Sequence, residues 1–384
     1  MNAAPVDKRA VVEVTLLLSS ILVAFALQRP VLFVGGFALC AVYVLLAHRR
    51  LIFKARQVFL FLLLTTLFLP AFFKPYFGLS PQFYFFNTLV MFLGAIALTR
   101  HPPEVLLWSL RISYGCFAAL IMMALYIHWG KPEPLGEIIS GSSTNGIPSY
   151  LIVVQVGLSL CNYLVHRQLP LVSALTTFVV AFYGYGRGSL VVAAMIVVIS
   201  LAYDIALWRS AGYRRRAMLL LFTLAITFGL AKYGNDFGNL LNSYTKLGAG
   251  LIDPNRLEIW EQYIGKINTW TFLFGADYSG TVIEAMYQGN PHISYIRTHA
   301  FFGLPVTLLA LLSPFLVFFS KKAWNTKIVF FTFIFMVSLR ATSEPILFPT
   351  LLDLYYFSFF ILFFRYAPEA KTSPAQQRVL AIHT

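Results

Sequence analysis

The sequence predicts an all-α integral membrane protein with about twelve transmembrane helices and one large outer loop that contains short helices. Hydrophobic residues make up 59% of the 384 residues, and charged residues make up only 11%. A soluble domain carries about 25% charged residues, so a water-soluble globule is excluded. Aromatic residues reach 16%, which excludes a disordered chain, because such chains are poor in aromatic side chains.

Apolar runs separated by polar breaks give the candidate spans, several of them shorter than the ~20 residues of a straight crossing. The predicted spans are residues 10–27, 30–47, 57–73, 82–99, 104–127, 147–165, 170–184, 189–207, 217–231, 299–319, 328–343 and 349–365. Nine spans therefore occupy residues 1–231 and three occupy residues 299–366. The segment 232–298 is the large loop, and residues 367–384 form a tail.

The positions of the basic residues predict the orientation of the chain. Lysine and arginine are concentrated in the short loops 48–56, 208–216 and 320–327, which are alternate connections between the predicted spans. Short cytoplasmic loops carry an excess of these residues, so both termini are predicted to be cytoplasmic and the loop 232–298 to lie outside. The net charge of +14 is then a consequence of topology, and we expect no nucleic-acid partner.

The large loop contains a predicted helix with an arginine in its first turn. Asp253 followed by Pro254 is a typical helix start, and Arg256 comes directly afterwards. The apolar residues that share one face of this helix are Leu257, Trp260, Ile264 and Ile267. A helix N-terminus favours anions, and a guanidinium adds donors suited to phosphate. The alternative is an amphipathic helix on the membrane surface, with Arg256 touching lipid headgroups.

A second arginine lies in a glycine-rich turn between two spans. Residues 183–189 read Tyr-Gly-Tyr-Gly-Arg-Gly-Ser, so Arg187 has glycine on both sides and Tyr185 two residues before it. Glycine permits a tight turn, which holds Arg187 at the outer edge of the hydrocarbon layer. The alternative is an arginine that simply extends from a helix end to the membrane surface.

The end of the loop contains histidines that lead into the next span. His292, Arg297 and His299 are all predicted at the outer interface. Histidine suits proton transfer near neutral pH, although a single interfacial histidine is more often structural. Glu344 lies four residues after Arg340, a spacing that favours an ion pair across one helical turn. The sequence has no D-x-D, H-E-x-x-H, C-x-x-C or P-loop pattern, so we expect no metal and no cofactor.

In order and spacing, these features resemble the bacterial superfamily of O-antigen polymerases and O-antigen ligases. The turn Gly186-Arg187-Gly188, the segment Asn255–Trp260 around Arg256 and the phrase Leu273–Asp277 follow one another as in that family. His292 then precedes Gly303 by eleven residues, and Thr307 follows four later. Ile293 stands where the family usually has a polar residue, which favours a polymerase over a ligase.

The resemblance implies a metal-independent, inverting glycosyltransferase of the bacterial inner membrane with its site in a large periplasmic loop. Its donor would be an oligosaccharide on undecaprenyl pyrophosphate. Arg187 and Arg256 would bind the pyrophosphate, and His292 would take the proton from the acceptor hydroxyl. Residues predicted to bind the substrate are Tyr185, Arg297, His299 and Glu344.

Three functions stay open from the sequence. A polymerase would join lipid-linked repeat units of O-antigen, capsule or exopolysaccharide, together with a chain-length regulator. A ligase would transfer the finished glycan to lipid A–core. A transporter or flippase of lipid-linked sugars also fits twelve spans, but transporters typically contain two related halves, and the large loop has no counterpart in the first half.

Overall fold

A computed structural model describes residues 6–47, 55–74, 81–128, 131, 134–137, 146–184, 186–206 and 254–369. These residues form helices and no strands, apart from one isolated antiparallel bridge between Lys322 and Glu369. The prediction of an all-α protein is therefore confirmed for the described part of the chain.

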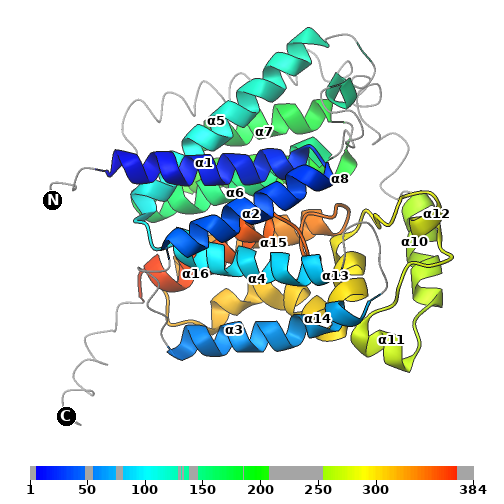
Figure 1. The fold of residues 1–384 in the computed structure, drawn as a ribbon. Helices are drawn as coiled ribbons and strands as arrows, with labels where there is room; N and C mark the ends of the chain where they lie inside the picture. The colour runs from blue at the N-terminus through cyan, green and yellow to red at the C-terminus, as the bar shows by residue number, and fades with distance from the viewer. Residues whose placement is uncertain are drawn as a thin grey trace.

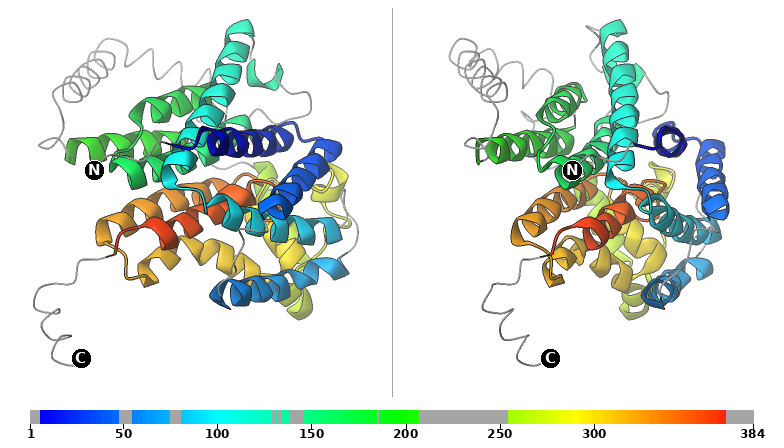
Figure 2. Two further views of the ribbon diagram at one scale, coloured as in Figure 1. Left: turned by 60° about the vertical axis from the view of Figure 1, so that its left-hand side comes forward. Right: turned by 90° about the vertical axis from the view of Figure 1, so that its left-hand side faces the viewer.

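Most of the helices run roughly along one direction and form a bundle (Figures 1 and 2). The first half contains α1 (Lys8–Ala26), α2 (Pro30–Ala47), α3 (Ala55–Phe68), α4 (Pro81–Leu98), α5 (Pro103–Ile127), α6 (Gly146–His166), α7 (Leu171–Tyr183) and α8 (Arg187–Ala206). The second half contains α10 (Pro254–Gly265), α11 (Thr269–Phe274), α12 (Val282–Ala285), α13 (Ser294–Phe302), α14 (Leu304–Leu312), α15 (Trp324–Ala341) and α16 (Asp353–Tyr366). Short 3₁₀ helices continue α3 as Leu69–Phe73 and α14 as Ser313–Phe319. Helix α5 is tilted, and α10 runs across the others (Figures 1 and 2).

Six of these helices are long and apolar enough to cross a membrane, namely α1, α2, α4, α5, α6 and α8. Three shorter apolar helices cover Val58–Phe73, Leu171–Tyr183 and Leu304–Phe319. The chain is thus a membrane-embedded helical protein. The predicted span 217–231 lies outside the described residues, and the total of twelve spans stays a prediction.

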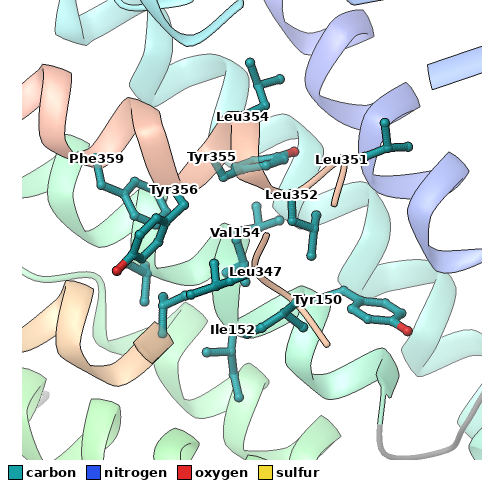
Figure 3. Packing of buried hydrophobic residues seen from close by; sticks show 14 of the residues in the cluster. Tyr150, Ile152, Val154, Leu347, Leu351, Leu352, Leu354, Tyr355, Tyr356 and Phe359 are labelled. Atoms are coloured by element: carbon teal, nitrogen blue, oxygen red, sulfur yellow. The ribbon is translucent and has the colours of Figure 1, made fainter. Parts of the chain in front are cut away.

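Helix α6 is the centre of the bundle. It packs against α1, α5, α7, α8, α15 and α16, and nearly all of its side chains are buried. An apolar helix surrounded by other helices needs no polar face, which explains why it is apolar on all sides. Figure 3 shows Ile152 and Val154 of α6 beside Leu347 and Leu352, from the segment that leads into α16.

Helix α2 has the opposite position, at the edge of the bundle. Of its residues only Gly36 and Cys40 are buried, and both lie at close helix contacts. A Cβ atom on Gly36 would lie 2.7 Å from Leu351 Cδ1. A Cβ atom on Gly94 of α4 would lie 2.5 Å from Cys40 Sγ. Small residues thus allow α2 to approach its neighbours, and its remaining apolar surface faces outward, as expected beside lipid.

The predicted span 299–319 is wrong as a single helix. Helix α13 already begins at Ser294, and the chain bends at Gly303, where φ is +78°. Helix α14 starts directly afterwards with Pro305 in its first turn. The apolar segment Leu304–Phe319 is therefore the part that can enter the membrane. The hydropathy of the sequence did not reveal the bend. Helix α13 is itself largely buried, so no polar break separates its end from α14.

Residues 254–293, which we call the loop layer, lie at one end of the bundle and contain α10, α11 and α12 (Figure 1). The predicted helix after Pro254 is present as α10, and the proposed N-cap residue Asp253 lies outside the described residues. Three of the four residues predicted to share its apolar face lie on α10, and the fourth does not. Ile267 lies beyond the helix end, and Leu257, Trp260 and Ile264 are exposed, whereas Ile259 and Tyr263 are buried.

Candidate functional site

A buried ion pair lies at the end of the bundle that carries the loop layer. Arg340 Nη2 is 3.0 Å from Glu344 Oε1, and both side chains are almost fully buried. Glu344 lies three residues beyond Ala341, the last residue of α15, so the pair joins the end of that helix to the segment leading to α16. The sequence predicted this pair, and the structure confirms it. Burial of two opposite charges in contact is tolerated only where further hydrogen bonds satisfy them.

Hydroxyl groups supply those hydrogen bonds to Arg340. Its Nε donates to Ser149 Oγ of α6 at 2.8 Å, and its Nη1 donates to Ser343 Oγ. Ser149 Oγ also lies 3.2 Å from Ser189 Oγ in the first turn of α8. The guanidinium therefore connects α6, α8 and α15 at one point. No sequence pattern indicated Ser149 or Ser189, because single serines in apolar runs are common.

The glycine-rich turn that contains Arg187 packs directly on this ion pair. Arg187 is the first residue of α8, and its side chain is half-buried. A Cβ atom on the next residue, Gly188, would lie 2.7 Å from Ser343 Oγ and 3.0 Å from Arg340 Nη1. Glycine at this position thus has a steric reason, and the close approach places the backbone of Arg187 beside the buried pair.

Arg256 reaches the same region from the loop layer. It lies in the first turn of α10 and is half-buried. Its charge is close enough to act on that of Arg340. Like charges are brought together only where other groups offset the repulsion, and Glu344 provides one such group.

The histidine segment is tied to Glu344 through Ser294. Ser294 Oγ donates to the backbone carbonyl of Glu344 at 2.5 Å and accepts from the backbone N–H of Leu347 at 3.1 Å. His292, two residues earlier, adopts a left-handed backbone conformation with φ of +54°. Its N–H donates to Asn290 Oδ1 at 3.0 Å, and its ring packs edge-on against that of Tyr287.

The structure gives His299 contacts on both sides of its ring. Nε2 donates to the carbonyl of Phe272 at 2.9 Å, so Nδ1 is left to accept from the hydroxyl of Tyr263 at 2.8 Å. The pKa of His299 lies below its ordinary value of 6.5, because burial disfavours the charged ring and Lys74 adds a nearby positive charge. His299 thus joins α10, α11 and α13, and its predicted substrate contact stays a prediction.

The two remaining candidates for substrate binding are Arg297 and Tyr185. Arg297 is half-buried and lies over the ring of Tyr84 of α4, with its guanidinium carbon 5.3 Å from the ring centre. Tyr185 lies outside the described residues.

Gly275 and Gly303 both belong to the sequence motifs described above. They hold the loop layer on the bundle. A Cβ atom on Gly275 would lie 1.9 Å from the carbonyl oxygen of His299. A Cβ atom on Gly303 would lie 2.1 Å from the carbonyl oxygen of Leu273. Both residues also have positive φ, at +89° and +78°. Their spacing in the sequence therefore reflects a close contact between α11 and the junction of α13 with α14.

Comparisons of the chain with protein-family models, with curated proteins and with solved structures find no match. The assignment of the site therefore depends on the geometry of Arg256, the turn before α8, the Arg340–Glu344 pair and the histidine segment.

Proposed function

We propose that this membrane protein is a metal-independent, inverting glycosyltransferase that polymerises lipid-linked repeat units of O-antigen, capsule or exopolysaccharide. Its place would be the bacterial inner membrane, with both termini in the cytoplasm and the site at the periplasmic face. The observation that supports this most is the gathering of three predicted site segments around one buried ion pair. Gly188 packs on Arg340, Arg256 interacts with its charge, and Ser294 binds the backbone of Glu344.

The cationic side chains suit a pyrophosphate leaving group. When the bond between sugar C1 and the phosphate oxygen breaks, its electron pair stays on that oxygen, so negative charge grows there. Preorganised guanidinium groups stabilise such charge by short, charge-assisted hydrogen bonds. We assign this task to Arg187 and Arg256, which are half-buried. Arg340 is fully buried and held by Glu344 and Ser149, so we assign it to positioning the turn before α8.

The acceptor is a sugar hydroxyl of a second lipid-linked unit. Its oxygen forms a bond to C1 on the face opposite the leaving pyrophosphate, which inverts the configuration. The hydroxyl proton passes to a ring nitrogen of His292 and from there to water. Arg297 is the candidate for contacts to the rest of the substrate, because its guanidinium lies on a single aromatic face at the loop end.

The first prediction concerns the three residues with assigned roles. Arg187→Ala, Arg256→Ala and His292→Ala should each abolish polymer formation, because each removes charge stabilisation or proton transfer. The measurement is the glycan profile of a deletion strain complemented with each variant, with membrane content checked by immunoblot. Arg9→Ala is the matched control, because Arg9 is exposed and pairs with the exposed Glu13 of α1. Full activity in all three variants contradicts the site.

The same deletion strain distinguishes a polymerase from a ligase. Without a polymerase, lipopolysaccharide retains a single repeat unit, whereas without the ligase it carries none. A transporter is distinguished by incubating purified protein in detergent with radiolabelled lipid-linked substrate. Product formation without membrane compartments excludes transport alone, and EDTA should leave the rate unchanged.

A further inference from the structure

Helix α11 presents aromatic side chains that nothing in the described chain covers. Trp270 is 71% exposed and Phe274 is 39% exposed, and their ring centres lie 4.6 Å apart. Phe272 and Leu273 of the same helix are also exposed. A capping box between Asn268 and Thr271 fixes the start of the helix, so this aromatic surface has a defined orientation.

Two contacts fix the level of α11 relative to the apolar spans. Its last turn touches Gly303, the residue immediately before the apolar helix Leu304–Phe319. Lys74, the residue immediately after the apolar helix Val58–Phe73, donates from Nζ to the carbonyl of Gly275. The last residue of one apolar helix and the first residue of the other therefore lie beside the end of α11. This places α11 at the boundary between hydrocarbon and water.

The exposed surface of the two spans continues that of α11. Phe73 is 81% exposed beside Lys74, and Leu308 and Leu312 of α14 are exposed as well. Helix α11 packs on α14, and α14 packs on α3, so the apolar surface is shared by neighbouring elements. In a membrane protein this outward surface faces lipid.

Helix α10 adds a second exposed apolar strip, made by Leu257, Trp260 and Ile264. Glu258 lies about a quarter-turn away from Leu257 around the same helix, is exposed, and accepts a hydrogen bond from Gln262 Nε2 at 3.0 Å. Tryptophan is enriched where membrane proteins cross from hydrocarbon to water, because its ring is amphipathic.

We propose that α10 and α11 form a wedge that inserts into the lipid leaflet on the loop side, with Trp270 and Phe274 at the boundary of headgroups and acyl chains. The partner is the bilayer itself, chosen because the wedge continues the lipid-facing surface of two spans at the level where both end. This inference does not depend on glycosyl transfer. It implies that Arg256, at the start of α10, is held at the membrane surface.

The test measures the depth of single spin labels in nanodiscs of phosphatidylethanolamine and phosphatidylglycerol. The exposed Cys116 is replaced by serine, while Cys40 and Cys161 are buried. Labels are placed by Trp270→Cys and Ile264→Cys, with Glu258→Cys as the control on the polar side of α10. Lipid insertion gives more frequent collisions with oxygen than with a water-soluble nickel chelate at positions 270 and 264, and the reverse at 258.

Two results overturn the proposal. In the first, the label at position 270 collides with nickel as often as the label at 258, which places α11 in water. Alternatively, that label is immobile and inaccessible to both reagents, which shows that protein covers the wedge, either a second copy or residues 207–253. Should Trp270→Cys aggregate, Phe274→Cys reports on the same surface. None of these readouts requires enzymatic activity, so they are independent of the test of polymerisation.

Discussion

The Arg340–Glu344 pair links stability to the candidate site at the scale of single residues. Glu344→Gln leaves the buried guanidinium without its counter-charge, and such losses cost about 3–5 kcal/mol. We expect a marked fall in the temperature of unfolding in detergent, measured by intrinsic fluorescence. Glu13→Gln is the control, because it removes the partner of an exposed pair and should change little.

A double variant separates the two roles of this pair. Arg340→Met with Glu344→Leu removes both charges together, and replacing a buried pair with apolar residues is often neutral for stability. We therefore expect recovery of the unfolding temperature without recovery of polymer formation, because the turn before α8 loses its anchor at Ser149. Recovery of both properties would show that the pair does not position the site.

His299 predicts a dependence of stability on pH. Its pKa in the folded protein lies below 6.5, so the unfolded chain binds a proton more readily. Its contribution to stability is therefore complete above pH 6.5 and decreases as the pH falls from 6.5 toward the folded pKa. We expect the unfolding temperature to fall between pH 7.5 and 5.5, and this fall to be smaller in His299→Gln. His166→Gln, at the exposed end of α6, should retain the slope of the unaltered protein.

At the scale of elements, hydropathy located most of the helices. Predicted spans such as 30–47, 82–99 and 104–127 agree with α2, α4 and α5 to within one residue at each end, because proline begins each helix. For α10, the sequence predicted a shared apolar face of Leu257, Trp260 and Ile264, but not whether that face is buried. Periodicity shows which residues share a face, but which face is buried depends on tertiary structure. Here Tyr263 contacts His299 of α13, and Ile259 beside it on α10 is buried.

The contact between α11 and the α13–α14 junction gives a prediction about glycine. Gly275→Ala and Gly303→Ala place a Cβ atom about 2 Å from a carbonyl oxygen, in backbone conformations that alanine rarely adopts. We expect each to lower the unfolding temperature and to increase amide exchange in α11. Gly115→Ala is the control, because a Cβ atom there meets nothing within 4 Å, and alanine favours the middle of α5. Unchanged exchange in both variants would contradict the close contact.

For the whole molecule, the sequence indicated which residues carry charge, and the fold determines which of them meet. Arg187, Arg256 and His292 were predicted as site residues from short motifs and their order along the chain. Gly188, Arg256 and Ser294 approach the Arg340–Glu344 pair only because α6 packs on α8 and α15. The link through Ser149 and Ser189 joins positions that no local pattern relates.

The 3₁₀ segments that follow α3 and α14 have a consequence for the fit between protein and bilayer. A 3₁₀ helix rises about 2.0 Å per residue, against about 1.5 Å in an α-helix. The stretch Leu304–Phe319 would measure roughly 24 Å as a continuous α-helix, but its 3₁₀ half extends it to roughly 28 Å, near the ~30 Å of the hydrocarbon core. Tighter winding thus compensates for a shortage of residues and reduces hydrophobic mismatch over the length of this segment.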